Sequence, residues 1–322
     1  MIKLLIYDSE TEELIDGKLE DIIEWDRESK KIAWLDIDNI DKESADFIQN
    51  SLWLHPLAIE SCFNEKALPK VEVYEKSCFV IFDAVNFNPG YRALDFIKLY
   101  GFLGDNFLVT VHNKPLRSVK QLAERIIKKP KMMESGADNI LYELLDTVVS
   151  YYFPIIDQFD ETITELEDRV FHKFDNVKLE EIFRIKKDLI SLRRSTNPQR
   201  DILSELSSRE IEYITPKTKT YFRDVFHHVW RIADTIDTYR DLLTGALESY
   251  MTILSNRMND VMKTLSVVAT IMLPLTVLTG IFGMNFEYMP GLTYKIGFYV
   301  MMIVMLVIIG FMAYYFKKKH WF

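Results

Sequence analysis

The sequence predicts a membrane protein of the α+β/α class, in which an N-terminal cytoplasmic α/β domain leads into a stalk, or funnel, of long helices and then two C-terminal transmembrane helices. Three observations support this fold class. Strand-like and helical segments alternate through residues 1–135, the pattern from residue 136 onward is almost entirely helical, and two uncharged apolar runs close the chain. Runs of about twenty apolar residues match the thickness of a bilayer's hydrocarbon core.

Composition narrows the possible functions. The chain has 322 residues and a formal net charge of −9, and the two apolar runs contain no Asp, Glu, Lys, Arg or His. Binding to nucleic acid requires a basic face, so nucleic acid is not an expected partner, whereas cations are compatible with this charge. No signal-peptide pattern begins the chain. Cys62 and Cys78 lack metal-type spacing, and we expect them to be reduced core residues of a cytosolic domain.

Residues 1–135 are predicted to form the α/β domain. Segments rich in β-branched and aromatic residues predict strands over 2–7, 31–38, 70–85 and 96–113, with a turn at Asn88-Pro89-Gly90. Helices are expected over 41–52, 55–63 and 116–129. No phosphate loop, nucleophile elbow or paired His or Cys at ligand spacing is present. We therefore expect no enzyme. The alternative, a membrane-anchored cytosolic enzyme, predicts a catalytic constellation in residues 1–215 and a featureless first span, and the sequence has neither.

Residues 136–214 are predicted to form an antiparallel pair of long helices. Apolar residues recur at three- and four-residue spacing over 137–174 and 177–208, with a join near Asp175-Asn176. The first helix carries an acidic set that is either a solvated helix face or a surface that attracts cations. Its members are Asp157, Asp160, Glu161, Glu165, Glu167 and Asp168.

Residues 215–284 are predicted to form one long helix that continues into the first membrane span, 265–284. It begins near Pro216, a favourable residue for a first helical turn, and Gly245 alone does not stop it. At 1.5 Å per residue such a helix is roughly 100 Å long. A single chain cannot bury a helix of that length, so the sequence predicts a homo-oligomer with parallel copies.

Charge asymmetry predicts the orientation in the cell membrane. The loop 285–295 contains one cation, Lys295, whereas the tail 317–322 that follows the second span, 296–316, begins with Lys317, Lys318 and Lys319. Basic residues favour the cytoplasmic side, so the tail is expected in the cytoplasm. Two spans then place both termini in the cytoplasm and the loop outside.

One face of the long helix is mostly small or polar and uncharged within the membrane. A closed coiled-coil core would carry large apolar residues at these positions, which argues against a membrane scaffold. The face fits either a narrow water-accessible pore or close helix contact in lipid, and its acidic continuation below the membrane favours the pore. Starting at Gly280 and moving toward the N-terminus in alternating steps of four and three residues, the face comprises Gly280, Thr276, Leu273, Ala269, Ser266, Met262 and Asn259.

The tripeptide Gly283-Met284-Asn285 lies at the outer end of the first apolar run and is followed by Phe286-Glu287-Tyr288-Met289-Pro290. In this setting it resembles the signature of the CorA family of magnesium and cobalt channels. The resemblance implies a homopentameric channel for Mg²⁺ influx, with Co²⁺ or Ni²⁺ as secondary ions, driven by the membrane potential and without an organic cofactor. It places the selectivity filter at Gly283, Met284 and Asn285, and the pore lining at Asn259, Met262, Leu265, Ala269, Leu273, Thr276 and Gly280.

The resemblance also implies a regulatory Mg²⁺ site in the cytoplasm, formed between subunits by Asp224 and Glu60. Ser61 stands where relatives often carry Asp, which removes one carboxylate from that site. His227 and His228 are vicinal, diverge around a helix and are interpreted as surface or interface residues.

The resemblance includes two further departures. Leu273 replaces a Met that relatives commonly have, and Gly291 replaces a loop Glu. Glu287 either attracts cations to the outer mouth or is an ordinary solvated carboxylate. The zinc-transporting branch of the same superfamily is the nearest alternative, but that branch tends to differ within the tripeptide, whereas Met284 is retained here.

Overall fold

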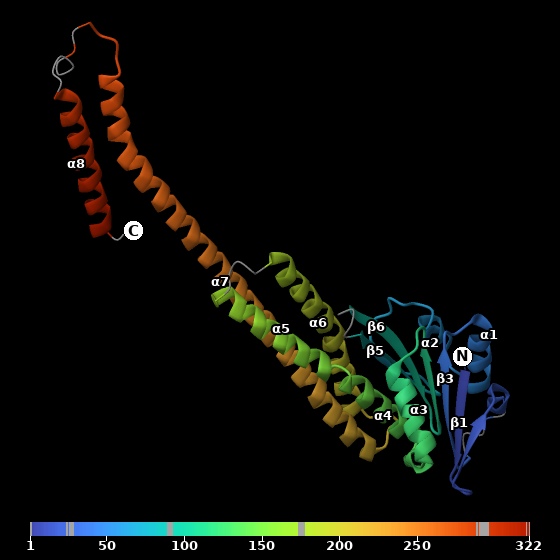
Figure 1. Ribbon diagram of the computed structural model, residues 1–322. Helices are drawn as coiled ribbons and strands as arrows, with labels where there is room; N and C mark the ends of the chain where they lie inside the picture. The colour runs from blue at the N-terminus through green and yellow to red at the C-terminus, as the bar shows by residue number, and fades with distance from the viewer. Residues whose placement is uncertain are drawn as a thin grey trace. The chain divides into compact units, whose positions relative to one another are not determined.

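The computed structural model describes residues 2–23, 25, 29–88, 93–172, 178–287, 289, 296–319 and 321 (Figure 1). It divides into two compact units, Met1–Gly245 and Ala246–Phe322. The predicted turn at Asn88-Pro89-Gly90 lies mostly outside the described residues. The helix junction at Asp175-Asn176, together with Gly291 and Lys295, lies outside them entirely.

The first unit contains a seven-stranded sheet in the order β2-β1-β3-β7-β6-β5-β4. Neighbouring strands are antiparallel except β3 and β7, which are parallel. Asp38 pairs with His112, so the two parallel strands end together. The strands are β1 Ile2–Asp8, β2 Glu13–Gly17, β3 Lys31–Asp38, β4 Lys70–Val73, β5 Cys78–Asn88, β6 Ala93–Leu103 and β7 Phe107–His112.

The prediction of single strands over 70–85 and 96–113 is wrong, because each segment forms two strands with a tight turn. Tyr74 donates its N–H to the Ser77 carbonyl at 2.9 Å, and Gly104 donates to the Phe107 carbonyl at 2.9 Å. Apolar residues on both sides of each turn hid the break from the sequence pattern. The short edge strand β2 is unpredicted, since its polar sequence is strand-like only when paired with β1.

Helices cover both faces of the sheet (Figure 1). On one face, α1 (Lys42–Leu52) and α2 (Pro56–Ser61) bury Ile48, Ile59 and their neighbours against β1, β3, β5, β6 and β7. On the other face lie α3 (Arg117–Lys128) and α4 (Ala137–Ser150), separated by the 3-10 turn η2 (Pro130–Ser135). A second 3-10 turn, η1, spans Leu19–Ile22. The three predicted helices of this domain are confirmed.

The prediction that the two cysteines are core residues is also confirmed. Cys62 and Cys78 are free thiols, and both side chains are fully buried. Burial raises the pKa of both thiols, that of Cys78 to about 12. Both thiols therefore stay protonated near neutral pH and act as small apolar core residues.

The single helix expected over 137–174 is instead two helices, α4 and α5 (Phe153–His172), with a turn at Tyr151 and Tyr152. Pro154 is the physical reason, because proline has no N–H with which to continue α4 but is tolerated in the first turn of a new helix. Tyr152 is buried at this turn, and its hydroxyl donates to the Asp83 carbonyl at 3.0 Å. The turn is thereby fixed against strand β5.

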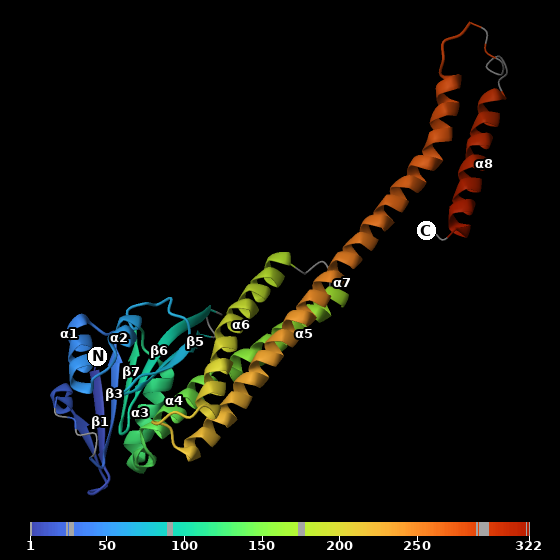
Figure 2. The ribbon, with the colours of Figure 1, turned by 180° about the vertical axis from the view of Figure 1, so that it is seen from behind.

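Three helices, α5, α6 (Leu179–Ser208) and the first part of α7 (Pro216–Phe282), run side by side in this unit (Figures 1 and 2). Arg169 of α5 contacts Glu181 of α6 at 2.8 Å, and Tyr239 of α7 donates to Asp160 of α5 at 3.0 Å. Asp160 therefore belongs to a helix contact, and it is one member of the acidic set described above. Helix α7 begins at Pro216 and passes Gly245 without interruption, as predicted.

The second unit contains the rest of α7 and α8 (Gly297–Lys318), which runs in the direction opposite to α7 (Figure 1). Both helices are long and apolar enough to cross a membrane. Large apolar side chains such as Leu273, Phe298 and Phe311 are about two-thirds exposed in the single chain. An apolar surface of this extent requires lipid or other helices to cover it.

Candidate functional site

The tripeptide lies where α7 ends. Helix α7 closes at Phe282; the N–H of Gly283 donates to the Thr279 carbonyl at 2.8 Å, and the N–H of Met284 donates to the Ile281 carbonyl at 3.3 Å. A Cβ atom on Gly283 would lie 2.9 Å from the Thr279 carbonyl oxygen, closer than real Cβ atoms come. Only glycine therefore permits this helix end without a shift of backbone. Met284 and Asn285 follow it with exposed side chains.

Threonine hydroxyls on the last turns of α7 bond to their own helix. Thr276 donates to the Met272 carbonyl at 2.9 Å, and Thr279 donates to the Leu275 carbonyl at 3.0 Å. Each hydroxyl thus donates its hydrogen bond within the helix, and the lone pairs of its oxygen remain available to accept another. Polar groups of this kind are tolerated at membrane depth where they line a cavity.

The membrane half of α7 has two distinct faces. Partly or fully buried residues recur at helical spacing at Val267, Ile271, Pro274, Leu275 and Leu278. At about 100° per residue, the centre of the candidate pore face lies roughly on the opposite side of the helix. Every candidate on that face is exposed in the single chain: Asn259, Met262, Leu265, Ala269, Leu273, Thr276 and Gly280.

No ionisable residue occurs between Thr264 and Asn285. The exposed face of α7 is therefore electrically neutral over the whole membrane half, with its carbonyl, hydroxyl and amide oxygens as the polar groups. A Cβ atom added at Gly280 would have no heavy atom within 4 Å, so nothing in the single chain requires glycine there. Glu287, beyond the tripeptide, is also exposed.

Asp224 lies on the first part of α7 and has a 70% exposed side chain. His228 stands between Asp224 and Asp146 of α4. Its Nδ1 lies 3.9 Å from Asp146 Oδ1, and its Nε2 lies 3.9 Å from Asp224 Oδ2. Burial raises the pKa of Asp146, and the nearby charge of Asp224 raises it further, while His228 and Arg125 act in the opposite direction. Two carboxylates thus share one neighbourhood, with Asp224 the accessible one.

Sequence reasoning missed Asp146. It is the single carboxylate within an apolar stretch of α4, Leu144-Leu145-Asp146-Thr147-Val148, and that isolation was the available signal. Its proximity to Asp224 depends on how α4 packs against α7, which periodicity does not reveal.

Glu60 is exposed on α2. The hydroxyl of the neighbouring residue, Ser61, donates a hydrogen bond to the Leu57 carbonyl at 2.9 Å within the same helix. In the described part of the chain, no hydrogen bond or ion pair joins Glu60 to Asp224, and no group of three His, Cys, Asp or Glu residues is placed to hold a metal ion. One subunit by itself does not bring these two carboxylates together.

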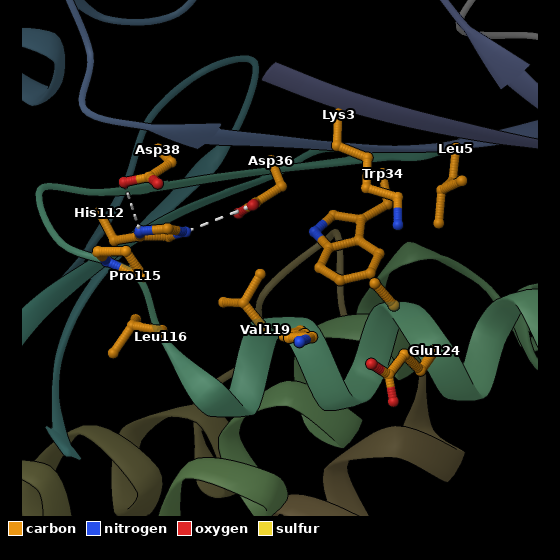
Figure 3. A pocket seen from close by; sticks show the side chains of 12 residues that line it. Lys3, Leu5, Trp34, Asp36, Asp38, His112, Pro115, Leu116, Val119 and Glu124 are labelled. Atoms are coloured by element: carbon orange, nitrogen blue, oxygen red, sulfur yellow. Dashed lines mark hydrogen bonds and ion pairs between the residues drawn. The ribbon is translucent and has the colours of Figure 1, made fainter. Parts of the chain in front are cut away.

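A pocket of about 350 Å³ lies between the sheet and α3 (Figure 3). At one end, His112 Nε2 is 3.3 Å from Asp36 Oδ2 and His112 Nδ1 is 3.5 Å from Asp38 Oδ1. Nδ1 also lies 2.8 Å from the Lys114 carbonyl. The ring nitrogens point to opposite edges and meet different carboxylates, so the cluster does not converge on one metal ion.

The environment of His112 favours its charged form. Burial lowers the pKa of His112, but the hydrogen bond and charge of Asp36, the charge of Asp38 and the Lys114 carbonyl together raise it above its ordinary value. The cluster ties together the ends of the parallel strands β3 and β7. Sequence reasoning missed it because its members are far apart in the chain.

The two long apolar helices and the neutral face of α7 are typical of a membrane protein. Comparison with known proteins identifies its family. The model of the family described as "CorA-like Mg2+ transporter protein" matches residues 29–318, and the chain belongs to this CorA family of divalent cation transporters, which are not enzymes.

Relatives support this assignment along almost the whole chain. The cobalt/magnesium transport protein CorA of Thermotoga maritima is 35% identical over 304 residues, 92% of this chain and 85% of that one. The zinc transport protein ZntB of Pectobacterium atrosepticum is 22% identical over 293 residues, 91% of this chain and 89% of that one. The structure of the CorA magnesium transporter from Methanocaldococcus jannaschii matches with a TM-score of 0.84 and 24% identity, covering 100% of this chain and 99% of the other.

Proposed function

We propose that this protein is a homopentameric channel that admits Mg²⁺, with Co²⁺ and Ni²⁺ as secondary ions, through a pore lined by α7. The observation that carries the proposal is the two-faced membrane half of α7. One face is packed within the single chain, and the opposite face is exposed, neutral and rich in small and polar residues. Parallel copies that turn this face inward would enclose a narrow path with hydroxyl and backbone oxygens along it.

The filter is assigned to Gly283, Met284 and Asn285. Mg²⁺ surrenders its water reluctantly, so a ring of neutral Asn285 amide oxygens can hold the hydrated ion through its waters without trapping it. A ring of carboxylates would bind more tightly and slow exit. Gly283 supports this role because its missing side chain lets the backbone turn immediately before Asn285. Glu287 would add negative charge at the outer mouth.

Met262, Leu265 and Leu273 would form the apolar constrictions of the pore, which can close by losing water. Asn259, Ala269, Thr276 and Gly280 would line the wider sections between them. We assign the channel to residues 215–284, the outer loop to residues 285–295, the second span to 296–316 and the basic tail to 317–322. Residues 1–135 and 136–214 would form the cytoplasmic domain and the helices that surround the stalk.

Both termini are assigned to the cytoplasm of a cell-membrane protein, on the basis of Lys317, Lys318 and Lys319 after the second span. An inside-negative potential then drives entry of a divalent ion by about 2 × 2.3 kcal/mol per 100 mV. This driving force requires no organic cofactor.

Cytoplasmic Mg²⁺ is proposed to regulate the pore at Asp224, with Glu60 supplied by the neighbouring subunit. The exposure of both carboxylates supports a site that two subunits share. Asp146 adds negative charge behind Asp224. Bound Mg²⁺ would neutralise these groups and hold the subunits together, and its loss would leave like charges to repel.

Zinc transport is the second candidate, and the similarity to ZntB favours keeping it. The intact Gly283-Met284-Asn285 and the 35% identity to a cobalt/magnesium transport protein favour Mg²⁺.

The test is ion flux into liposomes that contain the purified protein and a Mg²⁺-sensitive dye, under an imposed inside-negative potential. We compare the entry of Mg²⁺, Co²⁺ and Zn²⁺ for wild type, Asn285→Ala and Asn256→Ala. Asn256→Ala is the control, because it removes the same amide from a position of α7 outside the candidate pore set. We expect Mg²⁺ entry that is lost or loses selectivity only in Asn285→Ala. Zn²⁺ entry without Mg²⁺ entry would move the protein to the zinc candidate, and no flux from intact oligomers would refute the channel.

A further inference from the structure

An open groove between α6 and α7 is lined by arginines rather than carboxylates. It has a volume of about 330 Å³, lies within the first compact unit, and its lining includes neither Asp224 nor any residue of the candidate pore face. Its lining, which we call the arginine groove, consists of Ile190, Arg193, Arg194, Asn197 and Pro198 of α6 and Arg240 of α7.

Two of its arginines converge on a single carboxylate oxygen. Arg193 Nε lies 2.8 Å from Asp237 Oδ1, and Arg240 Nη1 lies 2.9 Å from the same atom. The single negative charge of Asp237 is therefore shared by two positively charged guanidinium groups. Arg194 adds a third positive charge at an exposed position of the groove. The three lining guanidinium groups, together with the one carboxylate that two of them contact, sum to an excess of two positive charges.

This positive charge is local and unusual for the chain. The protein carries a net charge of −9, yet residues 184–200 contain six Lys or Arg residues and one acidic residue, Asp188. The side chains of Arg193 and Arg240 are 43% and 34% exposed, so water and small ions reach them while helix packing restricts their motion. Because these guanidinium groups are already held in place on two packed helices, they would lose little side-chain freedom when an anion binds.

The geometry points to the class of ligand: we propose that the arginine groove binds a polyphosphate anion, the triphosphate group carried by a nucleotide or present as inorganic triphosphate. Guanidinium groups present planar forks of N–H donors that match phosphate oxygens in pairs. The Asn197 side chain adds an amide donor to the lining. The excess of positive charge excludes a metal cation, and the multiple arginines favour a ligand with several charges over a single chloride.

Metal-free triphosphate is expected to bind better than its Mg²⁺ complex. Mg²⁺ neutralises two of the negative charges and occupies the oxygens that the arginines would contact. Binding is also expected to weaken as ionic strength rises, because the groove is open to solvent.

The experiment is isothermal titration of the full-length protein in detergent with inorganic triphosphate, ATP, Mg²⁺-saturated ATP and adenosine. The variants are Arg194→Gln and Arg193→Gln. Lys186→Gln is the matched control, since it removes the same charge from an exposed site on α6 that does not line the groove. Intact folding is checked by the melting temperature, and Arg194 is the more informative site because its exposed side chain contributes little to packing.

We expect both triphosphates to bind, adenosine not to bind, and Arg194→Gln to weaken binding by roughly tenfold while Lys186→Gln changes it less than about twofold. Equal affinity for inorganic triphosphate and ATP identifies phosphate as the recognised group, and weaker binding of inorganic triphosphate identifies a nucleotide. Absence of binding, equal binding of adenosine, or equal losses in Arg194→Gln and Lys186→Gln would overturn the proposal. Because binding is measured without ion flux, this result is separate from the outcome for the channel.

Discussion

Thr215 donates both its backbone N–H and its hydroxyl to one oxygen of Asp138, at 2.9 and 2.8 Å. Asp138 is 3% exposed and stands in the first turn of α4, whereas Thr215 immediately precedes α7. This contact fixes the start of the long helix to the helix that covers the sheet. It also satisfies a backbone donor at a helix start that would otherwise be unpaired.

The first prediction concerns this contact. Asp138→Ala should lower the free energy of unfolding by about 2 kcal/mol, since it removes the buried carboxylate that accepts both hydrogen bonds from Thr215. The check is the melting temperature of the full-length protein in detergent. Asp201→Ala is the control, because the Asp201 side chain is 75% exposed and lies 3.5 Å from Arg200. A melting temperature of Asp138→Ala equal to that of the control would contradict the assigned role.

The second prediction concerns pH and His112. Because the pKa of His112 is raised in the folded protein, its stabilising contribution is complete below the ordinary value of 6.5 and is lost as pH rises through the folded pKa. The melting temperature should therefore fall as pH rises above 6.5, beyond any change seen in His112→Gln. Parallel curves for the two proteins between pH 6 and 9 would show that the titration of His112 does not affect stability.

The third prediction concerns the end of α7. Gly283→Ala places a methyl group 2.9 Å from the Thr279 carbonyl oxygen and forces the backbone to move just before Asn285. Mg²⁺ flux should drop at least tenfold while the oligomer remains intact. Gly310→Ala on α8 is the matched control, since no heavy atom lies within 4 Å of its added carbon. Normal flux in Gly283→Ala would show that the filter tolerates a different backbone path.

Local patterns predicted most of the elements, because their causes are local. Asp41 accepts a hydrogen bond from the N–H of Ser44 at the start of α1, and Pro216 is the first residue of α7. Both helix starts could therefore be predicted from the sequence. The tripeptide and its place after an apolar run were sufficient to predict the family.

The remaining features depend on contacts between distant segments. The pairing of β2 with β1, the neighbourhood of Asp146 and Asp224, and the cluster around His112 all join residues that the sequence separates. The exposed face of α7 was predictable by spacing, but its position opposite the packed face required the structure.

The fourth prediction concerns cytoplasmic regulation. Asp224→Asn removes the exposed carboxylate of the proposed site, so the Mg²⁺ concentration that protects the oligomer from limited proteolysis should rise by about fivefold or more. Asp201→Asn removes an exposed charge from α6 and should leave the protection curve unchanged. An unshifted curve for Asp224→Asn would remove Asp224 from the regulatory site, and Glu60→Gln would then test the other carboxylate alone.

The fifth prediction concerns the apolar constriction at Leu273. The side chain is 66% exposed in the single chain and lies on the neutral face of α7, where a ring of such residues would exclude water from a narrow path. Leu273→Ala widens that ring, so flux should rise several-fold at Mg²⁺ concentrations that close the wild-type channel. Val268→Ala is the matched control: Val268 is 54% exposed and lies roughly 140° around the helix from Leu273, toward the region outside the pore. Equal flux in the two variants would place the gate elsewhere, and a rise in Val268→Ala alone would show that the opposite face of α7 lines the pore.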